Sequence, residues 1–200
     1  MIRLSFFILL SLNYIESTFD TADGSMEMMD PDFLLIQKMK LGDDSALEDF
    51  VHKYYAKIFQ YCHLHIRDRG YAEDMTQETF EKFFRSLDTY RHYGKALNYL
   101  YVLAANTCKD YYKKTPELCL EEIPEGTSPD LTRIDEQVMI ESALGRLPPE
   151  LRETAILFFF QEMRQKEIGA VLGIGLPLVK YRIRKAKELL ADYLREEDNL

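Results

Sequence analysis

The sequence predicts an all-α protein of two small helical domains joined by an acidic linker, the second of them a helix-turn-helix domain. Apolar residues recur at helical spacing through both halves of the chain, and the second half holds two short helical stretches joined by a glycine turn. The segment between the halves is acidic, contains prolines and has no sustained apolar period. The domains are expected at residues 30–115 and 136–195, with the linker at 116–135.

Residues 1–29 stand apart from this pattern. An apolar run over residues 4–12 resembles the core of a signal peptide and is too short to span a bilayer. The globular pattern begins near Met26, Met28 and Met29, each a candidate start of translation. The extension is therefore interpreted as a start-site artefact or a signal-like segment, with an anchor on a membrane surface as a third alternative.

Helical spacing predicts four helices in the first domain. The first opens at Asp30-Pro31 and ends at Gly42, and the second is capped by Asp43-Asp44-Ser45. The third covers about 71–87 and the fourth about 95–114, separated by a loop at 88–94. The inward positions of the third helix are Thr76, Phe80, Phe83, Phe84 and Leu87.

Aromatic, basic and amide side chains gather on this loop and on the outer face of the fourth helix. Such a set suits single-stranded nucleic acid, because bases stack on tyrosine rings while Lys and Arg contact the backbone. The alternative is that these tyrosines belong to the core and its rim, as expected for Tyr101 and Tyr111 on the apolar stripe. The candidate contacts are Tyr90, Arg91, His92, Tyr93, Tyr99, Asn106, Lys109 and Lys113.

The third helix also carries an acidic stripe. Its members are spaced three and four residues apart, so they share one helix face, and a solvated face is the default interpretation. The stripe consists of Asp74, Gln77, Glu78 and Glu81.

Nothing in the sequence argues for catalysis or for a metal centre. The cysteines are scattered without paired spacing, so neither a disulfide framework nor a zinc site is expected. Cys62, His63 and His65 do not share a helix face, and Cys62 is expected to point inward. A phosphate loop, a nucleophile elbow and an HExxH motif are all missing, so we expect no cofactor and no small-molecule substrate.

The second domain begins with a helix at about 134–144. The next helix starts at residues 147–150 with prolines in its first turn, where a missing N–H costs little. Three consecutive aromatics, residues 158–160, cannot all be buried on one face, so one is expected to be exposed, with or without a partner. The positions expected to face the core are Leu151, Ala155, Phe158 and Phe159.

Residues 165–187 are predicted to form two helices joined by a tight turn. Gly169 lies where the helices approach closely, and Gly173 falls at the turn, where a positive φ is readily adopted only by glycine. Val179 and Ile183 face inward, so the opposite strip of the second helix points to solvent. A helix that enters the major groove has this layout, with base contacts in the middle and cations beside them. The candidate DNA contacts are Pro177, Lys180, Tyr181, Arg182, Arg184 and Lys185.

Charge is distributed unevenly along the chain. The net charge is −9, yet residues 144–195 carry ten Lys and Arg against six Asp and Glu, a local charge of +4. Residues 116–143 carry eight acids and one arginine, a local charge of −7. Because phosphate neutralisation supplies much of DNA affinity, the basic end alone is expected to bind DNA weakly and to need a partner.

Both halves of the chain resemble one protein family. Residues 72–80 (AEDMTQETF) and the helix over 99–111 are similar to the first domain of a bacterial RNA polymerase sigma factor. Residues 147–153 (LPPELRE) and the helix-turn-helix are similar to its last domain. The type resembled is the extracytoplasmic-function (ECF) sigma factor of the sigma-70 family, which keeps only these two domains, regions 2 and 4.

The resemblance implies a role for each site. The acidic stripe would dock on the clamp helices of the polymerase largest subunit. Residues 89–94 and the helix bearing Asn106 would melt the −10 element and capture a flipped base, and the helix over 176–187 would read the −35 element. The implied protein is a cytoplasmic, non-enzymatic factor that directs promoter recognition and transcription initiation. Its implied partners are core RNA polymerase, promoter DNA and an anti-sigma factor.

The sequence departs from the family pattern at several positions. Tyr99 stands where Trp is usual, Val102 and Ala105 where Arg is common, and Gly175 where Ser or Thr caps the second helix. Two other functions stay open on the residues alone. One is a stand-alone helix-turn-helix regulator that binds duplex DNA as a dimer, and the other is an RNA-binding module that uses the tyrosine-rich helix.

Overall fold

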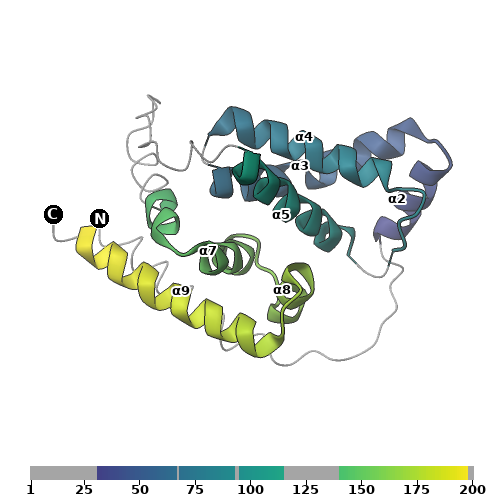
Figure 1. The fold of residues 1–200 in the computed structure, drawn as a ribbon. Coiled ribbons are helices and arrows are strands. Elements are labelled where there is room, and N and C mark those ends of the chain that lie inside the picture. The colour runs from purple at the N-terminus through teal and green to yellow at the C-terminus, as the bar shows by residue number, and fades with distance from the viewer. Residues whose placement is uncertain (1–30, 67, 93–94, 115–139, 198–200) are drawn as a thin grey trace. The chain divides into compact units, whose positions relative to one another are not determined.

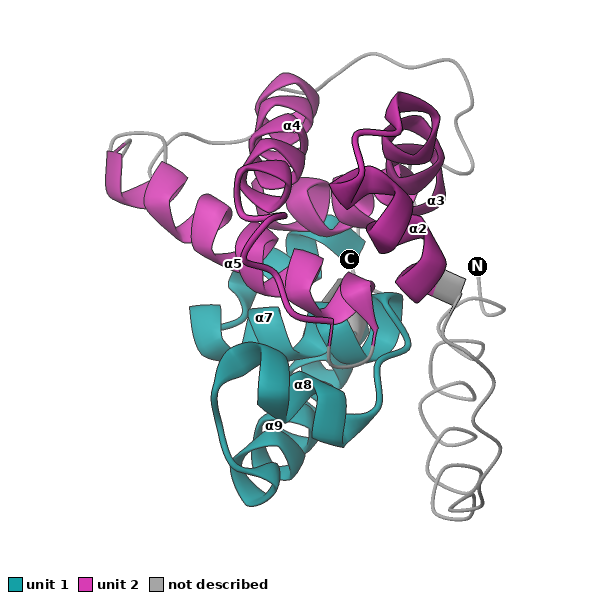
Figure 2. Ribbon diagram, turned by 90° about the vertical axis from the view of Figure 1, so that its right-hand side faces the viewer, with its two compact units in different colours: residues 1–26, 135–200 teal, residues 27–134 magenta. Residues whose placement is uncertain are grey.

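The computed structural model describes residues 31–66, 68–92, 95–114 and 140–197, and all regular elements in these ranges are helices. The chain divides into two compact units, one covering residues 27–134 and the other including residues 135–200 (Figure 2). The first unit holds α2 (Pro31–Lys40), α3 (Asp44–Ile66), α4 (Arg69–Arg85) and α5 (Ala96–Lys114). The second holds a helical stretch at 140–146, then α7 (Pro149–Ala155), the π-helix η3 (Ile156–Phe160), α8 (Gln165–Leu172) and α9 (Leu176–Glu197), as Figure 1 shows. The extension at 1–29 and the acidic linker at 116–135 lie outside the described residues.

The first unit is a three-helix bundle. Helices α3, α4 and α5 pack against one another, and α2 packs on α3. Phe50 of α3 stacks on Phe83 of α4, with ring centroids 4.7 Å apart. The inward positions predicted for α4 are confirmed, except that Phe84 is half-buried at the edge. The largest fully buried side chains of this unit are Ile36, Phe50, Ile58, Tyr61, Phe83, Leu100 and Tyr101.

Two acidic side chains shape the start of the bundle. Asp43 accepts hydrogen bonds from the Ser45 hydroxyl (2.7 Å) and the Ser45 backbone N–H (3.0 Å), which caps the start of α3. Asp32 is buried and accepts hydrogen bonds from the Lys53 ammonium (2.6 Å) and the Tyr54 hydroxyl (2.6 Å). The Asp43 cap fixes where α3 begins after the turn that ends α2. The hydrogen bonds to Asp32 hold α2 against α3.

In the second unit, α7 and α8 pack against α9, and η3 connects α7 to α8. The prediction that Phe158 and Phe159 face the core is wrong. Both are half-buried and pack edge to face against each other at 5.0 Å, while Ile156 and Leu157 are fully buried. The physical reason is the π-turn, which adds a residue to one turn and rotates the residues after it out of the 3.6-residue register.

Within the LPPELR stretch, residues 147–152, Arg152 connects two helical segments by hydrogen bonds. Its Nε donates to the Leu144 carbonyl (3.0 Å), and its Nη2 donates to the carbonyls of Gly145 (2.7 Å) and Leu147 (3.2 Å). These carbonyls lie at the end of the helical stretch 140–146, where intrahelical donors run out. Arg152, a residue of α7, therefore caps the C-terminal end of the preceding helical stretch.

The described residues contain no helix long and apolar enough to cross a bilayer, and no cluster of three His, Cys, Asp or Glu side chains suited to a metal. Cys62 is buried, as predicted, and so is Cys108. A hydrogen bond with the Cys108 thiol, together with one from Thr76, lowers the pKa of Cys62 against the effect of burial. The two thiols therefore meet inside the first bundle, between α3 and α5.

Candidate nucleic-acid interface

The turn between α8 and α9 is built on two glycines. Gly173 ends α8 in the left-handed conformation (φ 67°, ψ 32°), and the N–H of Ile174 bonds the Gly169 carbonyl at 3.0 Å. A Cβ on Gly169 would lie 2.9 Å from the Ile174 carbonyl oxygen and 3.7 Å from a methyl of Val179. Gly169 is therefore a site of close approach, but the prediction that the second helix crosses it closely is wrong: Val179 lies at an ordinary contact distance, and the backbone of the turn is the near neighbour.

Helix α9 presents two opposite faces. Val179, Ile183 and Ala186 are buried against the rest of the unit. Of the predicted DNA contacts, four are exposed and two, Arg182 and Lys185, are half-buried. The exposed ones are Pro177, Lys180, Tyr181 and Arg184. The structure thus brings the six predicted residues onto one end of one helix.

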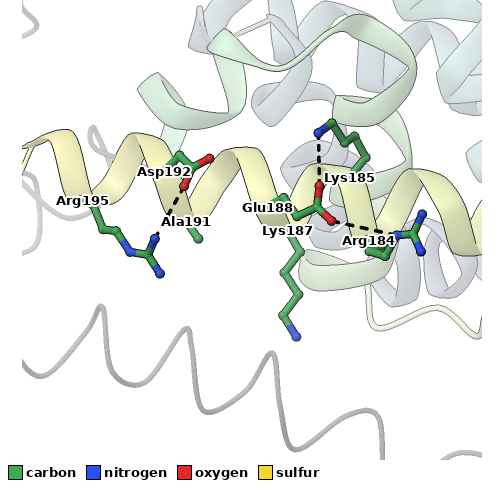
Figure 3. Close-up of a pocket in the computed structure, with 7 residues that line it drawn as sticks. All are labelled: Arg184, Lys185, Lys187, Glu188, Ala191, Asp192 and Arg195. Carbon is green, nitrogen blue, oxygen red and sulfur yellow. Dashed lines mark hydrogen bonds and ion pairs between the residues drawn. The ribbon is translucent and has the colours of Figure 1, made fainter.

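Glu188 lies among the cations of this face. Its carboxylate accepts a hydrogen bond from Lys185 Nζ at 3.1 Å and lies 3.9 Å from Arg184 Nε, between the two side chains in Figure 3. One turn further on, Arg195 pairs with Asp192 at 3.6 Å. Lys187 and Arg195 extend the basic face toward the C-terminus. They are not among the predicted contacts, although continuing the helical period beyond Lys185 would have included them. The hollow along α9 is lined by Arg184, Lys185, Lys187, Glu188, Ala191, Asp192 and Arg195.

In the first unit, Tyr90 and Tyr99 stack on each other. Their ring centroids are 5.0 Å apart, and both rings contact Phe83, at 5.3 and 6.1 Å. The Tyr90 carbonyl accepts from the Lys40 ammonium at 2.7 Å, and the Tyr90 hydroxyl bonds His92 Nδ1 at 3.1 Å. Both tyrosines therefore line the rim of the bundle with their rings already stacked.

The other predicted contacts of this unit are divided. Arg91, Asn106, Lys109 and Lys113 are exposed, the last three on the outer face of α5. His92 is half-buried, and Tyr93 lies outside the described residues.

For two tyrosines of α5, the sequence predicts a place in the core or at its rim. Tyr101 is fully buried, which raises the pKa of its hydroxyl and confirms the assignment. Tyr111 is half-buried and packs on Tyr71 at 5.4 Å, so it lies at the rim, as predicted. At the positions where the family often has arginine, Ala105 is buried and Val102 is half-buried. This part of α5 therefore presents no cation.

The acidic stripe on α4 is exposed or half-exposed along its whole length. Asp74 and Gln77 are exposed. Glu78 pairs with Lys82 at 2.8 Å and Glu81 with Arg85 at 3.1 Å, each with the cation one turn on. Lys82 also donates to the Thr107 hydroxyl of α5 at 2.9 Å, which ties the stripe to the bundle.

Comparisons with known proteins match both units to one family. Residues 50–116 match the model of sigma-70 region 2, and residues 137–190 match that of sigma-70 region 4. The chain is 29% identical over 175 residues to the ECF RNA polymerase sigma factor SigE of Mycolicibacterium smegmatis, covering 79% of this chain and 66% of that protein. It is 28% identical over 178 residues to SigW of Bacillus subtilis, covering 80% and 95%.

Solved structures share the fold. CnrH in complex with the cytosolic domain of CnrY aligns with a TM-score of 0.68 at 23% identity, over 82% of this chain and 96% of that one. RpoE in complex with the anti-sigma factor NepR, from Bartonella quintana, aligns with a TM-score of 0.64 at 18% identity, over 74% and 98%. With regions 2 and 4 present in this order, the chain belongs to the sigma-70 family as an ECF-type sigma factor, a non-enzymatic initiation factor that directs promoter recognition by RNA polymerase.

Proposed function

We propose that the two units make separate contacts during initiation. The acidic stripe of α4 docks on core polymerase, the α5 face with the 88–94 loop engages the −10 element, and α9 reads the −35 element. We also propose the domain limits 30–115, 116–135 and 136–195, with the acidic linker lying in a basic channel of the polymerase, and a cytoplasmic site of action.

The observation that carries the −35 assignment is the geometry of α9. Its buried face packs on α7 and α8, and its opposite face holds Tyr181 and Arg184 between cations. A helix-turn-helix places the N-terminal part of its second helix against base edges, with cations near phosphates. The 73% exposure of the Arg184 side chain leaves it accessible to a base edge.

The decisive experiment is transcription reconstituted with core polymerase. We expect promoter-specific initiation only when the chain and core polymerase are both present. Arg184→Ala is expected to relax preference at one upstream base pair, with a loss of about 1–3 kcal/mol there. A uniform loss over all sequences would instead show that Arg184 contacts phosphate. A tight operator footprint by the purified chain alone would favour the stand-alone regulator.

The acidic stripe is tested separately. Asp74→Ala and Gln77→Ala are expected to weaken binding to core polymerase without changing which promoters are used, because both side chains are exposed and neither belongs to the buried face of α4. Glu48→Ala, an exposed carboxylate on α3, is the matched control. Equal loss in all three variants would show a general charge effect rather than a docking surface.

An anti-sigma factor is proposed as a further partner. Support comes from the two structural relatives above, which are complexes of a sigma factor with CnrY or NepR. Such a partner would cover the polymerase and promoter surfaces when the signal is absent. Its expected effect is competition: an anti-sigma factor that binds this chain should prevent its assembly with core polymerase in a pull-down.

A further inference from the structure

Helix α9 exposes two large apolar side chains at its N-terminal end. Leu178 is 41% exposed and Tyr181 is 50% exposed, and they are the exposed large hydrophobic side chains among those described in residues 140–197. They lie three residues apart, so they are neighbours on the helix surface. Neither side chain belongs to the core, because the buried face of α9 is formed by other residues, among them Val179 and Ile183.

The surroundings of this pair indicate what covers it. Lys180 and Arg184 are exposed on the same part of the helix, Lys185 is half-buried beside Tyr181, and residues 144–195 carry a local charge of +4. An apolar pair among cations suits a surface that is both polyanionic and locally apolar. The major groove of DNA is such a surface, because each thymine presents a C5-methyl group between two rows of phosphates.

Leu178 and Tyr181 can contact base pairs other than the one proposed for Arg184. The Arg184 side chain lies further along α9, where it is 73% exposed and 3.9 Å from the Glu188 carboxylate. The first turn offers Pro177 and Leu178, neither of which has a polar side-chain atom. We propose that Leu178 and Tyr181 contact thymine methyl groups, so that the upstream element read by α9 contains at least one thymine selected by its methyl. This inference rests on the proposed −35 role of α9.

The test removes the methyl group and nothing else. The preferred upstream element is first selected from a randomised promoter library with the full chain and core polymerase. Each thymine of that element is then replaced in turn by deoxyuridine, and binding of the polymerase complex is measured. A buried methyl contributes about 0.8 kcal/mol. Replacement at one or two of the thymine positions should therefore each weaken binding by about fourfold, and replacement elsewhere should have no effect.

Variants assign the effect to the pair. At one of the positions where the wild type discriminates, the complex with Leu178→Ala should bind the thymine promoter and the deoxyuridine promoter equally. Leu41→Ala, which shortens an 86% exposed leucine in the first unit, should keep the full discrimination. Lys180→Ala should weaken binding to both promoters by the same factor, because phosphates are identical in the two.

Three results would overturn the proposal: no replacement changes binding, Leu178→Ala keeps the discrimination, or Leu178→Ala impairs assembly with core polymerase while the thymine-to-uracil ratio stays unchanged. The last result would assign the pair to a protein partner. In each case promoter-specific transcription by the wild-type complex would leave the proposed function intact. Loss of that transcription in the wild type would overturn both.

Discussion

At the residue scale, Gly169 controls how closely α8 approaches the turn. Alanine in a helix interior is favoured over glycine by about 1 kcal/mol, whereas overpacking costs about 1–3 kcal/mol. The new Cβ would lie 2.9 Å from the Ile174 carbonyl oxygen, a backbone atom that cannot rotate away. We therefore expect Gly169→Ala to destabilise the second unit by about 1 kcal/mol, and Gly169→Val by more. Urea unfolding followed by circular dichroism measures the change.

Gly175 offers the matched control. Its carbonyl accepts from the N–H groups of Leu178 and Val179, so it occupies the N-cap position of α9. A Cβ there meets only Pro177 Cδ, at 3.7 Å. Gly175→Ser should stabilise the unit by a few tenths of a kcal/mol. If Gly169→Ala is as stable as the wild type, the close approach is not a constraint.

Asp43 makes stability depend on pH. Hydrogen bonds from the Ser45 hydroxyl and then the Ala46 N–H hold the pKa of Asp43 below its usual value of 3.8. A carboxyl whose folded pKa is depressed stabilises the fold above its unfolded pKa, and this contribution is lost as pH falls through the folded pKa. Asp43→Ala should therefore lower the melting temperature at pH 7, and the gap should narrow at acid pH, below 3.8.

Asp43→Asn separates the cap from the charge. Asparagine keeps an acceptor oxygen for the start of α3 but does not titrate. At pH 7, the melting temperature of Asp43→Asn should lie closer to that of the wild type than the melting temperature of Asp43→Ala does. A gap between Asp43→Ala and the wild type that is constant with pH would contradict the prediction.

At the element scale, Arg152 joins the 140–146 stretch to α7. Hydrogen bonds to charged groups contribute about 1.5–3 kcal/mol each, and Arg152 donates to three carbonyls from one guanidinium. Because these bonds share one side chain, we expect Arg152→Ala to cost about 2–3 kcal/mol rather than their sum. Chemical denaturation reports the loss.

Two further variants interpret that loss. Arg152→Lys keeps the charge but lacks the planar fork, so it should recover less than half of the stability. Arg146→Ala removes a cation 5.2 Å from the Tyr193 ring and should cost below about 1 kcal/mol. Full recovery by lysine would show that charge alone matters at residue 152.

At the scale of the whole molecule, charge decides how the protein uses DNA. A chain of net charge −9 with a +4 segment offers few phosphate contacts of its own. Each phosphate contact contributes a slope of about −0.9 to the logarithm of affinity against the logarithm of salt concentration. Polymerase must supply the remaining contacts, so the share that belongs to α9 is measured by how much the salt dependence of the assembled complex changes when a charge of α9 is removed.

Two variants of α9 should change that slope in opposite directions. Lys180→Ala removes one cation and should make the slope shallower by about 0.9. Glu188→Gln removes the carboxylate that pairs with Lys185, so it should strengthen binding at low salt and steepen the slope. Promoter binding by the polymerase complex is measured between about 50 and 200 mM salt. A shift of both variants in one direction would contradict this account of the α9 surface.

The sequence alone predicts the all-helical class, the helix-turn-helix with its turn at Gly173, and the acidic stripe on α4. Each depends on local properties: apolar period, the conformational freedom of one glycine, and the spacing of charges along one helix. The resemblance to ECF sigma factors rests on the same short stretches, and the matches to regions 2 and 4 confirm it.

Only the tertiary structure decided which side chains meet. The π-turn placed Ile156 and Leu157 in the core instead of Phe158 and Phe159, because one added residue in a turn changes every later position. Likewise, the Tyr90–Tyr99 stack, the carbonyls held by Arg152 and the exposure of Leu178 depend on how elements pack. Helical period specifies the face on which a residue lies, whereas packing between elements decides what covers that face.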